Sequence, residues 1–178
     1  RRSVEHIEAV RADIPVHYVD GRSSFDAVLG PIYRGLTDLL LRSAADAGSE
    51  RRPALLRQAR DTIELLRQTE LEDYLRDRCS LGAARGNAPA VLPGGIAVLY
   101  PIVLDDRVEL LVETASSIDS FTVAVAGDMV RRLAVDFGAA LRGNRATQAQ
   151  AEQLYRWLLL PLEPTLAEHR VGTVVVLP

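Results

Sequence analysis

Residues 99–113 read LYPIVLDDRVELLVE, two apolar-rich runs around the acidic pair Asp105 and Asp106. The runs 96–104 and 108–112 are short and rich in aliphatic and β-branched residues, and the segment DDR separates them. This pattern predicts a β-hairpin. Asp-Asp is a usable turn, although it is weaker than Asn-Gly or Asp-Gly.

Two further strands are predicted after the hairpin. Residues 121–125, FTVAV, predict a third strand beyond the loop TASSIDS. Pro101 has no amide proton for a sheet ladder, so we expect it at an edge, a bulge or a strand terminus. Residues 173–177, TVVVL, are mostly β-branched and apolar, which is typical of a central strand of a parallel α/β sheet, covered on both faces.

A strand of that kind needs partner strands and covering helices, and these 178 residues do not supply them. We therefore expect an incomplete sheet in which residues 173–177 form an under-covered edge. We also expect this exposed strand to make the 178-residue chain a homodimer by strand pairing, or to be buried in some other way.

The first half of the chain is predicted to be helical. Apolar residues at helical spacing predict one helix within 24–45, with Pro31 at its first turn, and a second within 50–80. The short linker AGSERR makes these two an antiparallel helical hairpin. The amphipathic stretch 3–14 predicts a third helix in front of them.

Helices are also predicted between the third and the last strand. One starts near Gly127, and Thr147 with Gln150 predicts a capping box for the next. Pro161 breaks that helix, and a short helix through His169 leads to the last strand. The apolar faces of the two longer helices carry Met129, Val130, Leu133, Phe137 and Leu141, and Leu154, Tyr155, Trp157, Leu158 and Leu159.

The change of pattern along the chain predicts three parts. Residues 1–80 form a helical segment, residues 81–95 a linker rich in Gly, Ala and Pro, and residues 96–178 an α/β part. The predicted fold class is α/β, of the mixed α+β kind. A helical hairpin is followed by a β-hairpin, a strand and helices, which lead into the first core strand of an incomplete sheet.

Composition argues against two classes of partner. The net charge is −3, and all 21 basic residues are arginines scattered among acidic residues, so no basic stripe for nucleic acid is present. No apolar run approaches the ~20 residues that span a bilayer. The charged start RRSVEHIEAVRADI is not a secretory leader. We expect neither nucleic acid nor membrane as a partner, and the cytoplasm is the default location.

No set of side chains predicts a catalytic, cofactor-binding or metal site. His6, His17 and His169 lack the spacing of metal ligands, and the single cysteine, Cys79, ends a helix without an obvious base. His17 and Asp20 could orient one another, but a loop-facing polar residue is the simpler interpretation. His169 falls at a helix C-terminus, where a cation interacts favourably with the helix dipole.

Three other features have structural explanations. Turn chemistry accounts for Asp105 and Asp106 without a carboxylate dyad. The PGG segment at 93–95 precedes a strand and not a helix, so it is no phosphate loop. Tyr155 and Trp157 lie on a leucine-rich helix, where core packing explains them better than a stacking platform.

The order of these motifs resembles the opening of a CHAT domain, the caspase-like module found behind tetratricopeptide repeats in bacterial proteins. In that family a hairpin with a YP…L.DR.ELL pattern precedes an (F/Y)TV.V strand, a helix, a QLY.WL..PL helix and an apolar strand. The matching stretches are LYPIVLDDRVELLVE (99–113), FTVAVAGDMVRRLAVDFGAAL (121–141), AEQLYRWLLLPLEPTLAE (151–168) and VGTVVVLP (171–178). The helical stretches before them look like the segment that joins the repeats to the CHAT module, so the resemblance covers most of residues 28–178.

The resemblance implies a caspase-like sheet and a cysteine peptidase whose catalytic His and Cys follow core strands beyond residue 178. No residue of this chain then takes a catalytic role. We expect the chain to be the non-catalytic N-terminal scaffold of such a protein, with the remainder of the CHAT domain as its partner. The alternative is a non-enzymatic interaction module, in which the helical hairpin presents a groove to a protein or peptide.

Overall fold

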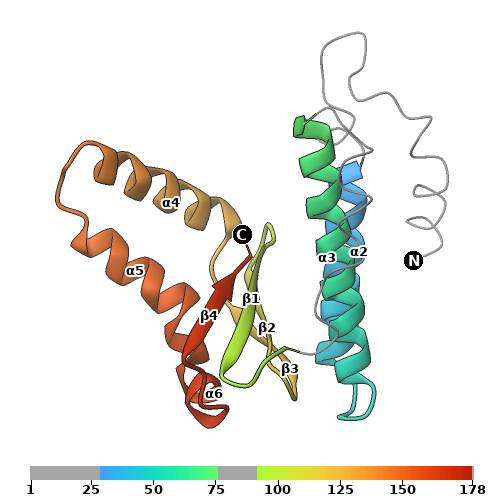
Figure 1. Cartoon of the computed structure of the whole chain (residues 1–178). Helices are drawn as coiled ribbons and strands as arrows, with labels where there is room; N and C mark the ends of the chain where they lie inside the picture. Colours follow the sequence, from blue (N-terminus) through green and yellow to red (C-terminus); the bar gives the residue numbers. More distant parts are fainter. Residues whose placement is uncertain (1–28, 76–91, 178) are drawn as a thin grey trace, which may run out of the picture. The chain divides into compact units, whose positions relative to one another are not determined.

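The chain has the mixed α/β fold that its sequence predicts. A computed structural model describes residues 29–75 and 92–177, and the chain divides into two compact units, Arg1–Ala90 and Val91–Pro178. The first unit contributes helices, and the second contributes a four-stranded mixed sheet with further helices (Figure 1). The predicted helix at 3–14 lies outside the described residues.

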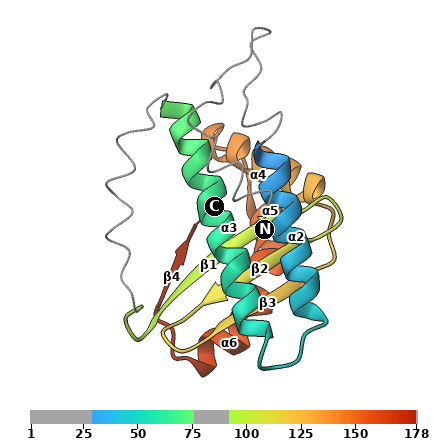
Figure 2. The same ribbon diagram turned by 90° about the vertical axis from the view of Figure 1, so that its right-hand side faces the viewer.

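The described part of the first unit is the predicted helical hairpin. Helices α2 (Gly30–Ala45) and α3 (Arg52–Leu75) lie side by side (Figure 2). The side chains they bury recur every three or four residues, so they form one face on each helix. These residues are Tyr33, Thr37, Leu41 and Ala44 on α2, and Leu56, Ala59, Thr62, Ile63 and Leu66 on α3.

Polar groups inside the hairpin are satisfied locally. The buried Thr37 donates its hydroxyl hydrogen to the Tyr33 carbonyl oxygen, 2.9 Å away. Arg52 Nη1 donates to the carbonyl oxygen of Ala44 at 3.3 Å, which ties the start of α3 to the end of α2. Pro31 lies in the first turn of α2, where its missing N–H costs no intrahelical bond.

The second unit is built on a sheet with the strand order β3-β2-β1-β4. Strands β1 (Ile96–Val103) and β2 (Val108–Glu113) form the predicted hairpin, and β3 (Ile118–Val123) continues it antiparallel. Strand β4 (Thr173–Val176) pairs parallel with β1. The expectation that the last strand forms an edge of the sheet is therefore confirmed.

The third strand starts earlier than the sequence pattern predicts. Residues 118–120 were expected in a loop, but they pair with residues 111–113 of β2. The turn between the strands is shorter because the Thr114 hydroxyl accepts hydrogen bonds from the backbone N–H groups of Ser116 and Ser117, at 3.3 and 3.0 Å. This local bonding closes the hairpin within four residues.

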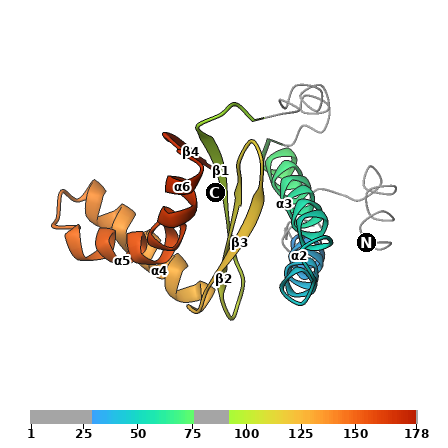
Figure 3. The same ribbon diagram turned by 90° about the horizontal axis from the view of Figure 1, so that it is seen from below.

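The helices of the second unit all lie on one face of its sheet (Figure 3). They are α4 (Gly127–Arg142), α5 (Gln148–Leu158), the 3₁₀ turn η4 (Leu160–Leu162) and α6 (Glu163–Glu168). The predicted capping box at the start of α5 is wrong. Thr147 is the N-cap residue, but with φ −125° and ψ 0° its side chain makes no capping hydrogen bond.

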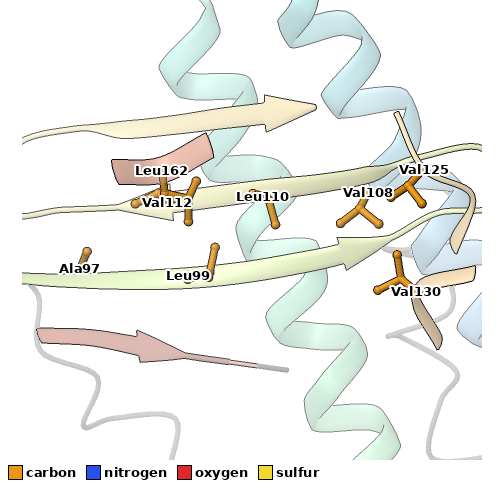
Figure 4. Close-up of a cluster of buried hydrophobic side chains, with 8 residues drawn as sticks. All are labelled: Ala97, Leu99, Val108, Leu110, Val112, Val125, Val130 and Leu162. Atoms are coloured by element: carbon orange, nitrogen blue, oxygen red, sulfur yellow. The ribbon is translucent and has the colours of Figure 1, made fainter. Parts of the chain in front are cut away.

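The core of this unit forms between the sheet and these helices (Figure 4). Successive residues of a strand point to opposite faces, so alternate positions of β1 and β2 meet Leu162 of η4 and Val130 of α4. Leu154, Trp157 and Leu158 of α5 pack against the same cluster. The eight buried residues of this cluster are Ala97, Leu99, Val108, Leu110, Val112, Val125, Val130 and Leu162.

Some residues predicted on apolar helix faces are exposed. Met129 and Leu141 of α4 keep 49% and 55% of their surface, and Tyr155 of α5 and Leu159, the C-cap residue of α5, are also exposed. Helix α4 joins the core near its first turn, through Val130. The rest of the helix extends from the sheet toward α5, so its apolar stripe is only half-buried (Figure 1).

The start of α4 lies against the hairpin that opens the sheet. The Gly127 amide donates to the Asp105 carbonyl oxygen at 3.3 Å. A Cβ atom at Gly127 would lie 2.1 Å from the Leu104 carbonyl oxygen and 2.7 Å from Val103 Cγ1. Only glycine fits this close approach, which fastens α4 to the β1–β2 turn.

Candidate functional site: the open edge at β4

Strand β4 is an edge strand without a charged residue. Within the described residues no strand lies beyond it, because the sheet order ends at β4. Val175 and Val176 keep 41% and 49% of their surface exposed, although valine is among the residues most often buried. Edges of soluble sheets are usually protected by charge, proline or cover, so this exposed apolar edge needs an explanation.

The backbone of β4 divides its hydrogen-bonding groups between two sides. The Thr173 amide donates to the Gly95 carbonyl oxygen at 3.1 Å, and the Leu177 amide to the Leu99 carbonyl oxygen at 2.9 Å. Alternate residues of a strand direct their amides to opposite sides. The N–H and C=O groups of Val174 and Val176 are therefore directed away from β1, toward the open side.

Pro101 interrupts the row of amides with which β1 faces β4. The register pairs Leu99 with Val176, and the next bond of a parallel ladder would run from the amide of residue 101 to the Leu177 carbonyl oxygen. Proline has no such hydrogen. Pro101 therefore lies inside β1, beside Leu110 of β2, at the point where β4 ends. At this point β1 has no described neighbour on its β4 side, in line with the predicted edge position.

The start of β4 is held by the glycine segment at 93–95. Gly95 takes a left-handed φ of 77°, and its carbonyl oxygen accepts from the amides of Gly172 and Thr173, at 2.8 and 3.1 Å. The segment leads into a strand, as the sequence indicates. Its role in anchoring β4 has no signal in the sequence, because the two parts are more than seventy residues apart.

A polar network around the buried carboxylate of Glu109 lies near the opposite edge of the sheet. Arg107 Nε donates to Glu109 Oε1 at 2.7 Å, and the Thr122 hydroxyl lies 3.0 Å from both carboxylate oxygens of Glu109. The side chain of Glu109 is 7% exposed and that of Arg107 12%. Because Thr122 belongs to β3, the network ties this edge strand to β2.

The turn residues Asp105 and Asp106 behave as the sequence indicates. Both side chains are exposed, and the Leu104 amide donates to the Arg107 carbonyl oxygen at 2.9 Å to close the turn. Asp106 accepts a hydrogen bond from Arg107 Nη1 at 3.0 Å. Neither aspartate has a positive φ, so the turn is not of the primed type that Asn-Gly favours.

His169 is the C-cap residue of α6, which confirms its predicted place at a helix C-terminus. Its ring also reaches the β2–β3 turn: Nδ1 lies 3.5 Å from Ser116 Oγ, and Nε2 lies 3.3 Å from Ser117 Oγ. Within the described residues, the ring bonds only to these two hydroxyls. These contacts link the end of α6 to the β2–β3 turn.

The aromatic residues of α5 differ in their surroundings. Trp157 packs against the core, whereas Tyr155 is exposed and donates its hydroxyl hydrogen to Glu163 of α6. This hydrogen bond raises the pKa of Tyr155 above its ordinary value. Core packing therefore accounts for Trp157 but not for Tyr155, which joins α5 to α6.

The remaining residues considered from the sequence, His6, His17, Asp20 and Cys79, lie outside the described residues. Across residues 29–75 and 92–177, no group of three or more His, Cys, Asp or Glu side chains could hold a metal ion. No helix in the described part of the chain has the length and apolarity to cross a bilayer. The arrangement at β4 instead offers backbone hydrogen bonds and apolar side chains to another strand.

Comparison with known proteins returns no relative. No family model, no curated protein and no solved structure matches the chain.

Proposed function

We propose that this chain is the non-catalytic N-terminal scaffold part of a CHAT-type protein, a caspase-like cysteine peptidase. The catalytic His and Cys are contributed by residues outside this sequence, and no residue of this chain takes part in the chemistry. The observation that carries this proposal is the exposed, uncharged β4 at an open edge of the sheet.

The direction of β4 supports a continued sheet. Parallel strands in proteins are normally covered on both faces and flanked on both sides. β4 is parallel to β1, has outward-directed amides at Val174 and Val176, and exposes Val175 and Val176 on opposite faces. Further strands beside β4, with their helices, would remove this exposure.

In this proposal the other elements of the second unit support the sheet. The antiparallel β1–β2–β3 part extends the sheet away from β4, and α4, α5 and α6 cover one face of it. The close packing of Gly127 on the β1–β2 turn fixes the start of that cover. A scaffold of this kind positions a catalytic site without contributing to it.

The test compares the 178-residue chain with the protein encoded by its whole natural reading frame. Val176→Lys should lower the melting temperature of the whole protein clearly, because the new charge would lie inside a completed sheet. The same substitution should change that of the 178-residue chain little, because Val176 is half-exposed there. Val135→Lys is the matched control, since Val135 keeps 66% of its surface on α4.

Activity gives a second, independent readout. The whole protein should cleave peptide substrates and lose this activity with an alkylating reagent for cysteine, whereas the 178-residue chain should be inactive. A reading frame without a further strand, or a whole protein insensitive to Val176→Lys, would contradict the proposed scaffold role. The interaction module built on α2 and α3 would then be the better explanation.

A further inference from the structure

We draw no further inference here: the strongest candidate, the half-exposed apolar face of α4 that carries Met129, Leu133, Phe137 and Leu141, is only partly covered, and nothing in the described residues shows what completes its cover.

Discussion

The two edges of the same sheet are built in opposite ways. Strand β3 is an edge with Asp119, Ser120 and Thr122, and Thr122 is bound to the buried carboxylate of Glu109. Strand β4 is an edge with three valines, and two of them are largely exposed. The β3 edge thus carries polar residues and is bonded to β2 through Thr122 and Glu109. The β4 edge is apolar and exposed.

This difference concerns how each edge is protected against pairing with another strand. Natural edge strands carry charges or other features that prevent pairing, and β3 follows this rule. β4 does not, and its parallel direction suits the interior of a sheet. In the described residues the β3 edge is therefore protected against pairing, and the β4 edge is not.

The largest expected effect on stability concerns Gly127, at the start of α4, which follows β3 in the chain. Gly127→Ala should lower the free energy of unfolding by about 4 kcal/mol, because the added Cβ overlaps backbone that cannot move cheaply. That atom would lie 2.1 Å from the Leu104 carbonyl oxygen. Urea denaturation followed by circular dichroism measures the change.

Another glycine of the same helix provides the control. At Gly138 a Cβ would lie 3.5 Å from Arg142 Nη1, which is an ordinary contact. Gly138→Ala should therefore stabilise the chain by about 0.5–1 kcal/mol through helix propensity. Equal effects of the two substitutions would mean that α4 is not fastened to the hairpin at Gly127.

The next effect concerns the polar network beside β3. Glu109→Ala should lower the free energy of unfolding by about 3 kcal/mol, because Arg107 loses its buried carboxylate partner. Glu152→Ala, which removes an exposed partner of Gln148 on α5, should change it by less than about 0.5 kcal/mol. Thermal and urea unfolding of both variants would decide whether the network holds this side together.

A smaller effect on stability is expected when threonine is replaced by valine on each of the two edges. Thr122→Val should lower the free energy of unfolding by about 1 kcal/mol, because the Glu109 carboxylate loses a hydroxyl donor. Thr173→Val, on the exposed start of β4, should stay within about 0.5 kcal/mol of the unchanged chain. A larger loss at Thr173 than at Thr122 would reverse the comparison between the edges.

The sequence predicts much of this fold because its signals are local. Helical spacing identifies α2 and α3, the paired apolar runs identify β1 and β2, and the uncharged run at 173–177 identifies an under-covered edge. The early start of β3 was missed because Thr114 shortens the turn by bonds that only the folded backbone makes.

The contacts around the candidate site are less accessible to prediction because they join distant residues. His169 meets Ser116 and Ser117 only when α6 reaches the β2–β3 turn. Glu109 meets Thr122 only in one strand register, which no local pattern specifies. The sequence shows directly that β4 carries no charge. The direction of its outward amides follows only from the hydrogen bonds between β4 and β1 in the folded structure.

The smallest expected effect concerns the end of β4. Pro101→Val supplies the missing donor opposite the Leu177 carbonyl oxygen, so the ladder between β1 and β4 can gain one bond. The free energy of unfolding should change by less than about 1 kcal/mol, because the new hydrogen bond is offset by the lost rigidity of proline in the unfolded chain. The decisive measurement is hydrogen exchange at residue 101. Its new amide should exchange as slowly as that of Leu177, which is bound to Leu99. If it exchanges as fast as the outward amides of Val174 and Val176, proline does not set the length of β4. The small number of residues in β4 would then have a cause other than Pro101.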